Sequence, residues 1–240
     1  MLVSLRAVVF DFDGVIANSE PLHFKGYRDV LAPEGVMLGE SDYYNRYLGF
    51  DDVGAFEAIA ADNGLSWPAD KIAQLVTMKA ARLEQLEREG SILFPGAREV
   101  IARLAGACPI AIASGALGQE VRRVLERTEL ARFFTTIVSA EDTPAGKPAP
   151  DPYRLAVERL REITKIALGP SECVAIEDSV WGLMSARGAG LRTIAITHTY
   201  PAEALASSAD AIVTHLDQLT IEYVRSVFGP AEAGLHDRQG

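Results

Sequence analysis

Two carboxylates follow a short apolar run near the start of the chain, in the segment AVVFDFDGV that contains Asp11 and Asp13. Residues 7–10 are apolar and predict a buried strand, and side chains two positions apart on a strand point the same way. Both acids are therefore expected on one side of the strand's end. Two acids placed there alone would be unfavourable, because neighbouring like charges raise each other's pKa. The alternative is an acidic turn that caps the next element.

Three further strand ends carry polar groups that could bind phosphate or a metal. The run IAIA ends at Ser114 and Gly115, which offer a hydroxyl and a backbone N–H. The loop AGKPAPDPY contains Lys147, and the run CVAIEDS ends in Glu177 and Asp178. Each has a structural alternative: a helix cap at Ser114, an exposed loop lysine at Lys147, and another cap at the acidic pair.

Taken together, these groups favour phosphoryl transfer. In an open parallel sheet, ligands bind beyond the carboxyl ends of the strands. Acids gathered there would bind a hard divalent cation, and Mg²⁺ is expected because it takes oxygen ligands and retains waters. The Mg²⁺ and Lys147 would neutralise a phosphate dianion that the acids alone would repel.

The elements that must position these groups alternate along the chain between β-like and helical patterns. This alternation, rich in Val, Ile and Ala, predicts an α/β fold with a doubly wound parallel sheet covered on both faces. Strands are predicted at 7–10, 110–114, 136–139, 174–176, 193–197 and 211–213, and helices at 97–104, 118–128, 151–161, 179–188 and 202–206.

One stretch interrupts the alternation, because no convincing strand occurs between residues 20 and 90. Two amphipathic helices are predicted there, one in DDVGAFEAIAADNG and a longer one from Pro68 to Gly90. An insert of about 70 residues is too long for a loop, so a small helical second domain is expected at 20–90. The core domain would then comprise 1–19 and 91–228, followed by a flexible tail at 229–240.

Composition excludes several function classes. The 240-residue chain has a net charge of −10 and a pI of about 4.9, so it would repel a nucleic-acid backbone. No apolar run reaches the roughly 18–20 residues of a membrane helix, and the N-terminus lacks the features of a signal peptide. Cys108 and Cys173 are expected to be small buried thiols. A cytoplasmic monomer is expected.

The four strand-end motifs, in this order and at these spacings, resemble those of the haloacid dehalogenase superfamily. DFDGV resembles the first motif of that family, ASG the second, GKPAPDPY the third and EDS the fourth. The resemblance covers roughly residues 5–215 and is to the helical-cap branch, with β-phosphoglucomutase and phosphoglycolate or sugar-phosphate phosphatases. It implies a Rossmann-like core, an inserted α-helical cap and a small phosphorylated metabolite as the substrate.

The same resemblance implies a role for each residue of the motifs. Asp11 is implied as the nucleophile that forms an aspartyl-phosphate, and Asp13 as the general acid and base. Mg²⁺ is implied to bind the Asp11 carboxylate, the backbone carbonyl of Asp13 and Asp178, with Glu177 as a further ligand or an orienter of its waters. The groups implied to grip the phosphoryl oxygens are Ser114, the Gly115 amide and Lys147.

Substrate selection is expected to depend on the cap. His23 stands where β-phosphoglucomutase-like proteins carry a histidine that supports the proton-transferring Asp, and the alternative is a helix-face histidine in solvent. Lys79, near the middle of the long helix, could bind an anionic group of the substrate or be solvated. The loop YLGFDD carries Asp51 and Asp52 where members of that branch carry a basic residue for a second phosphate.

The resulting hypothesis is a Mg²⁺-dependent phosphatase for a sugar, polyol or glycolate phosphate. The alternative is a β-phosphoglucomutase-type phosphosugar mutase, which must hold a bisphosphate. The acidic loop argues against a mutase, whereas His23 is consistent with one. A non-catalytic binding protein is a third alternative, but all the motif acids are intact. Asp13 argues against dehalogenation, because dehalogenases of the superfamily lack this second acid.

Overall fold

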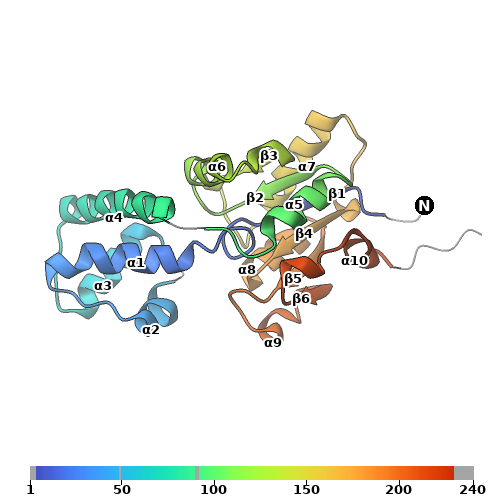
Figure 1. The fold of residues 1–240 in the computed structure, drawn as a ribbon. Helices are drawn as coiled ribbons and strands as arrows, with labels where there is room; N and C mark the ends of the chain where they lie inside the picture. Colours follow the sequence, from blue (N-terminus) through green and yellow to red (C-terminus); the bar gives the residue numbers. More distant parts are fainter. Residues whose placement is uncertain (1–3, 49, 90–91, 230–240) are drawn as a thin grey trace, which may run out of the picture. The chain divides into compact units, whose positions relative to one another are not determined.

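The computed structural model of the chain describes residues 4–48, 50–89 and 92–229, which form two compact units. The core unit contains the chain up to Ala17 and from Leu93 onward, and the helical unit is the stretch Asn18–Ile92. Figure 1 shows the elements of each unit, coloured along the sequence. The domain limit predicted between residues 90 and 91 lies outside the described residues, as does the tail predicted at 229–240 except for its first residue.

Six parallel strands form the sheet of the core unit, in the spatial order β3-β2-β1-β4-β5-β6. β1 and β4 are neighbours at the centre, and the strand order reverses between them, as in the doubly wound fold predicted from the sequence. The strands are β1 (Ala7–Phe10), β2 (Ile110–Ala113), β3 (Phe134–Val138), β4 (Cys173–Glu177), β5 (Arg192–Ile196) and β6 (Ala211–Val213).

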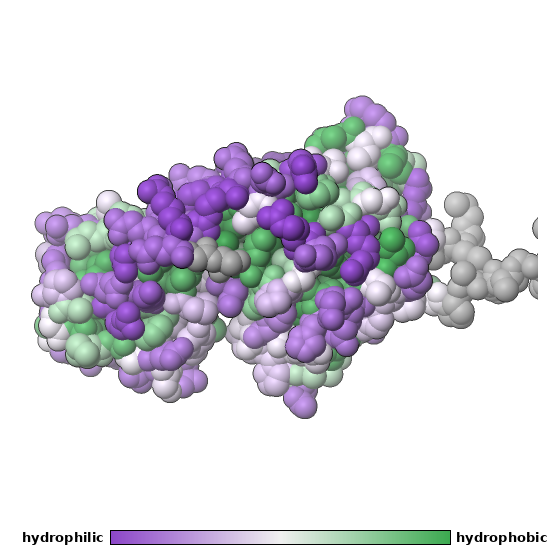
Figure 2. All heavy atoms as spheres, viewed as in Figure 1, coloured by the Kyte–Doolittle hydropathy of each residue, from purple (hydrophilic) through white to green (hydrophobic). Residues whose placement is uncertain are grey.

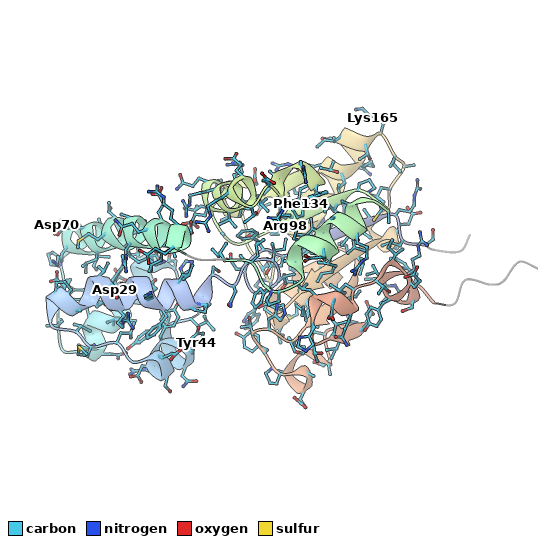
Figure 3. The ribbon with its side chains drawn as sticks, viewed as in Figure 1. Asp29, Tyr44, Asp70, Arg98, Phe134 and Lys165 are labelled. Carbon is cyan, nitrogen blue, oxygen red and sulfur yellow. The ribbon has the colours of Figure 1, made fainter. Side chains whose placement is uncertain are left out.

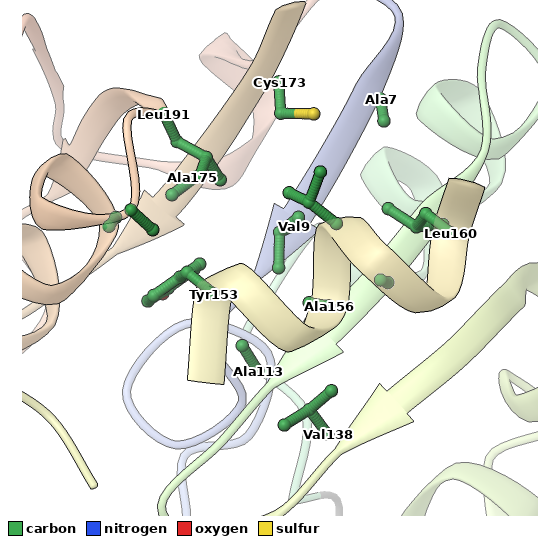
Figure 4. Packing of buried hydrophobic residues seen from close by; sticks show 14 of the residues in the cluster. Ala7, Val9, Ala113, Val138, Tyr153, Ala156, Leu160, Cys173, Ala175 and Leu191 are labelled. Atoms are coloured by element: carbon green, nitrogen blue, oxygen red, sulfur yellow. The ribbon is translucent and has the colours of Figure 1, made fainter. Parts of the chain in front are cut away.

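Helices cover both faces of this sheet. Figure 4 shows α7 lying across the strands, where Tyr153 and Ala156 join the buried cluster that contains Val9 of β1. Val8 and Phe10 point to the opposite face and are equally buried, so that face is covered as well. The helices of the unit are α5 (Ala97–Ala105), α6 (Gly118–Arg127), α7 (Asp151–Thr164), α8 (Val180–Gly188), α9 (Ala202–Leu205) and α10 (Ile221–Ser226).

The helical unit has its own apolar core, in which Tyr27, Phe56 and Leu75 from three different helices meet. Asp29, labelled in Figure 3, accepts a hydrogen bond from Arg82 Nε at 2.9 Å and joins α1 to α4. Hydrophilic residues cover the outward side of α4 in Figure 2, as expected of an amphipathic helix. Its helices are α1 (Glu20–Leu31), α2 (Glu40–Asp42) with the following π-helical turn (Tyr43–Tyr47), α3 (Asp52–Asp62) and α4 (Ala69–Glu89).

The bounds of β1 and β6 are the predicted ones, and those of the other four strands differ from the predictions by one or two residues. β3 begins at Phe134 rather than residue 136, because Phe134 already pairs with Ile110 of β2, and its ring packs edge-on against Phe10 with centroids 6.2 Å apart. Both cysteines are free, Cys173 buried and Cys108 only partly so. None of the helices that the structure describes is long and apolar enough to span a membrane.

Candidate active site

The candidate site lies where β1 and β4 end. Phe10 pairs with Ile176 in register, and the Asp11 N–H still donates to the Ile176 carbonyl at 2.9 Å. This pairing sets Asp11 beside the end of β4, which carries Glu177 and Asp178. These two strands flank the reversal of strand order, which is where doubly wound sheets bind ligands.

Three buried carboxylates and a lysine form the centre of the site. Asp11, Glu177 and Asp178 each offer an oxygen within 4.8 Å of the other two. Lys147 Nζ donates to Asp11 Oδ1 at 2.6 Å and to Glu177 Oε1 at 2.5 Å, and it lies 5.2 Å from the centroid of the Tyr153 ring. Lys147 is therefore not an exposed loop residue, because it bridges two of the acids.

Glu177 has no exposed surface, and protein donors engage both of its carboxylate oxygens. Besides the lysine, Oε1 accepts a hydrogen bond from the Tyr153 hydroxyl at 2.7 Å. Oε2 accepts from the backbone N–H groups of Asp178 and Ser179 at 3.2 and 3.4 Å and from the Ser179 hydroxyl at 3.2 Å. A Cβ on Gly182 would lie 1.9 Å from Oε1, so this glycine of α8 makes room for the carboxylate.

Burial and the close packing of these charges shift their pKa values. Burial and the charge of Glu177 raise the pKa of Asp11 well above its ordinary value, against the opposing effect of Lys147. Burial and Glu177 also raise the pKa of Asp178 to about 7. Burial alone would lower the pKa of Lys147, but Asp11 and Glu177 raise it. Simultaneous ionisation of all the acids in the cluster is therefore unfavourable.

The donor set fits a hard divalent cation. When the three acids are ionised beside Lys147, their charges of −3 and +1 leave a net −2. One divalent ion would balance this charge and relieve the repulsion that raises the pKa values of the acids. The atoms offered are all carboxylate oxygens, the ligands that Mg²⁺ prefers.

The remaining predicted residues of the core unit follow β1 and β2. Ser114 is buried, and its Oγ accepts a hydrogen bond from the Ala116 N–H at 2.9 Å. Gly115 is exposed, and a Cβ there would meet nothing within 4 Å, so its predicted role needs the N–H rather than the absence of a side chain. Asp13 is partly buried and pairs with Ala17 in an isolated bridge.

Two residues at the site were missed by sequence reasoning. Tyr153 of α7 donates to Glu177, and Thr199, in the loop after β5, donates to Asp178 Oδ2. No pattern distinguishes Tyr153 from an ordinary buried helix residue. A signal did exist for Thr199, because the polar run that contains it follows β5 just as the predicted site residues follow other strands.

Within the helical unit, the two predicted residues meet each other. Lys79 Nζ lies 2.8 Å from His23 Nδ1 and donates to Asp52 Oδ1 at 2.6 Å, an oxygen that also accepts from the Tyr27 hydroxyl at 2.6 Å. Lys79 is 2% exposed, so it is neither solvated nor unpaired. Because the ammonium only donates, His23 Nδ1 accepts and the ring proton is on Nε2. Burial and Lys79 lower the pKa of His23 to about 3.

Comparisons with known proteins show what the chain is similar to. Residues 5–190 match the family described as haloacid dehalogenase-like hydrolase. The chain is 33% identical to the protein CbbY of Rhodobacter capsulatus over 208 residues, which cover 82% of this chain and 88% of that protein. It is 30% identical to hexitol phosphatase B of Escherichia coli (strain K12) over 193 residues, which cover 80% of this chain and 83% of that enzyme.

A solved structure extends the likeness to three dimensions. The crystal structure of a CbbY mutant from Rhodobacter sphaeroides in complex with xylulose-(1,5)bisphosphate superimposes with a TM-score of 0.76 at 26% sequence identity. The match covers 90% of this chain and 96% of that one. The likeness therefore includes nearly the whole of both chains.

Proposed function

The chain belongs to the haloacid dehalogenase-like hydrolases, and from that premise we propose that it is a Mg²⁺-dependent phosphatase that acts through an aspartyl-phosphate. The observation that carries the proposal is the cluster of Asp11, Glu177 and Asp178 around Lys147 at the switch point of the sheet. Burying three acids beside a single lysine costs free energy that a purely structural role would not explain. These groups suit a site that gathers a divalent ion and a phosphate.

Asp11, Asp178 and the backbone carbonyl of Asp13 would hold the Mg²⁺. When bound, the ion supplies positive charge that stabilises the transferring phosphoryl group. Glu177 differs from the other two acids because protein donors engage both of its oxygens. We assign Glu177 to holding Lys147 in position rather than to direct ligation.

The two acids that follow β1 would have different chemical roles. Asp11 attacks phosphorus through a carboxylate oxygen, the bond from phosphorus to the leaving oxygen breaks, and Asp13 gives its proton to the departing alcohol. Asp13, now ionised, takes a proton from the water that attacks the phosphorus. The bond from phosphorus to Asp11 breaks, inorganic phosphate leaves, and both acids return to their starting states.

The phosphoryl oxygens would be bound by groups that follow two strands, β2 and β3. Lys147 offers an ammonium, Ser114 a hydroxyl and Gly115 a backbone N–H. Lys147 already donates to Asp11, so the same lysine can align the attacking carboxylate and draw charge from the phosphoryl group. Ser114 is buried and the Lys147 side chain is only 13% exposed, so little water competes and these interactions are strengthened.

The proposed substrate is a small sugar or polyol phosphate. Hexitol phosphatase B and CbbY, to which the chain is similar, are named for or crystallised with phosphorylated carbohydrates. In the helical unit, Asp52 neutralises Lys79, which removes a cation that a second phosphate would need. The resemblance implies that this unit selects the leaving group, so the pairing favours a phosphatase over a bisphosphate-handling mutase.

Two assays on one purified sample with Mg²⁺ test the proposal. One follows phosphate release from a panel of sugar and polyol phosphates, and the other follows conversion of β-glucose 1-phosphate to glucose 6-phosphate with a trace of the bisphosphate. We expect phosphate release without isomerisation, its loss in Asp11→Asn, and its retention in the exposed control Asp217→Asn. Isomerisation with little phosphate loss would identify a mutase, and full turnover by Asp11→Asn would refute the nucleophile.

A further inference from the structure

The loop that follows β5 is fastened to the candidate metal site by two consecutive side chains. Thr199 Oγ1 donates a hydrogen bond to Asp178 Oδ2, and His198 Nδ1 lies 2.8 Å from the Gly14 carbonyl oxygen. Gly14 directly follows Asp13, and Asp178 directly follows β4. The loop therefore holds both segments that supply the acids, and neither side chain has a part in the mechanism described above.

Gly14 shows how closely these groups meet. Its φ is +77°, and a Cβ there would lie 1.9 Å from Asp178 Oδ2 and 3.0 Å from Thr199 Oγ1. The turn after Asp13, the Asp178 carboxylate and the Thr199 hydroxyl thus pack at a single point. A directional hydrogen bond at this point fixes the rotation of the carboxylate, because only a narrow range of orientations satisfies it.

His198 is held on two sides. A carbonyl oxygen only accepts, so Nδ1 carries the ring proton and donates it to Gly14. The imidazole stacks on the Phe94 ring with centroids 3.8 Å apart and planes at 18°. The Phe94 N–H in turn donates to the Ile16 carbonyl at 3.0 Å. These contacts tie the Gly14 carbonyl to a fixed support within the core unit.

We propose that Thr199 and His198 are positioning residues of the metal site. Thr199 holds the Asp178 carboxylate in the orientation that ligates the ion, and His198 holds the backbone that follows Asp13. The inference rests on the proposed function, because it assigns both residues to the proposed Mg²⁺ site. Hydrogen-bond partners of metal ligands typically account for about 10–100-fold in metal affinity.

Matched variants of Thr199 separate the hydrogen bond from packing. Thr199→Val keeps the branched shape and removes the donor, whereas Thr199→Ser keeps the donor. Mn²⁺ serves as the probe, because it takes the same oxygen ligands and its free concentration is read by electron paramagnetic resonance. In the full chain without substrate, we expect Thr199→Ser to bind Mn²⁺ as the wild type does and Thr199→Val to bind about tenfold more weakly or worse.

His198→Phe provides the second arm of the test. This variant keeps an aromatic ring to stack on Phe94 but cannot donate to the Gly14 carbonyl. We expect a several-fold loss of Mn²⁺ affinity, with a melting temperature close to that of the wild type. His198→Asn, which keeps a donor but loses the stacking ring, should have a lower melting temperature and keep more Mn²⁺ affinity than His198→Phe.

The outcomes separate this inference from the proposed function. If Thr199→Val binds Mn²⁺ as tightly as the wild type, the positioning role is refuted. If the wild type binds no Mn²⁺, or if Asp178→Asn binds it unchanged, the proposed metal site itself fails. Melting temperatures without metal guard against misfolding, and because Thr199 is exposed we expect them to change little. If valine is not accommodated, Thr199→Ala makes the same comparison with Thr199→Ser.

Discussion

Gly14 and Gly115 both follow strands that lead into the candidate site, yet only the first needs to be glycine. Gly14 has a φ of +77°, and a Cβ would collide with Asp178 Oδ2 at 1.9 Å. Gly115 has open space around its missing Cβ, and an alanine there would keep the N–H that the mechanism uses. At the residue scale, Gly14 is needed because the Asp178 carboxylate approaches its backbone closely, whereas Gly115 is needed only for its backbone N–H.

This difference predicts that substitution by alanine is damaging at Gly14 and tolerated at Gly115. Gly14→Ala should lower kcat/KM at least about tenfold and destabilise the fold by about 1–3 kcal/mol, because the backbone is strained and the Asp178 carboxylate must move. Gly115→Ala should keep both within about twofold and about 0.5 kcal/mol. Steady-state kinetics and chemical denaturation of the two variants measure this. Equal damage from both substitutions would contradict the geometry.

His23 predicts how stability responds to acid. Its pKa falls from 6.5 to about 3 on folding, so below about pH 6.5 the unfolded chain takes up a proton that the folded chain does not. The free energy of unfolding should therefore fall as the pH falls through this window, by up to about 1.4 kcal/mol per pH unit. Above the window His23 adds no pH dependence.

The variant His23→Gln isolates this contribution. Denaturant unfolding at about pH 6.5 and about pH 5 should show a smaller loss of stability in His23→Gln than in the wild type, by up to about 2 kcal/mol. Subtracting the two proteins removes the titration of other groups. If both lose the same stability between these pH values, His23 is not held neutral by burial and Lys79.

At the scale of elements, an ion pair whose lysine is buried joins α3 and α4 of the helical unit. Lys79 of α4 donates to Asp52 at the start of α3, and Tyr27 of α1 donates to the same oxygen. Lys79 is nearly inaccessible, whereas the Asp52 side chain is 32% exposed. Removing the acid would thus leave a buried ammonium without its counter-charge, which costs more than removing both partners.

A double-mutant cycle tests this element-level prediction. Asp52→Ala should lower the free energy of unfolding by about 2 kcal/mol or more, and adding Lys79→Met to it should restore part of the loss. The Lys79→Met change alone should cost less than Asp52→Ala alone, because methionine fills the apolar path of the lysine stem. Strict additivity of the two changes would show that the pair carries no coupling.

The order of elements and the convergence of the acids could be predicted because both follow from local patterns. Apolar runs ending in Asp11 and Glu177 identify strands and their carboxyl ends, and parallel pairing brings those ends together. The burial of Lys79 could not be predicted, since it depends on which helices pack and on the partner that Asp52 supplies. The contact of Tyr153 likewise depends on tertiary packing that leaves no periodic trace in the sequence, whereas the polar run after β5 is a signal for Thr199.

At the scale of the whole molecule, an acidic chain gathers three acids at the centre of its sheet. The net charge is −10, and the cluster of Asp11, Glu177 and Asp178 adds repulsion in a buried position. A ligand that binds the folded state alone stabilises it by mass action. Divalent ions should therefore stabilise this protein through the core unit rather than through its acidic surface.

Thermal melts with and without metal test this molecular prediction. Millimolar Mg²⁺ should raise the melting temperature of the wild type, whereas equal ionic strength from NaCl should not reproduce the rise, because screening acts on exposed charges. Asp178→Asn should melt at nearly the same temperature with and without Mg²⁺. An equal rise in Asp178→Asn would show that the ion binds elsewhere.

The central claim is that Asp11 attacks phosphorus and Asp13 transfers protons, and a single-turnover burst measures it most directly. An aryl phosphate that the wild type hydrolyses has a leaving group that needs no proton, so Asp13→Asn should still form the aspartyl-phosphate but release it slowly. We expect Asp13→Asn to release about one equivalent of phenolate per site in a burst, with the phosphoryl label on the peptide that contains Asp11. We expect no burst from Asp11→Asn. A burst that persists in Asp11→Asn, or a label on another residue, would contradict the assignment.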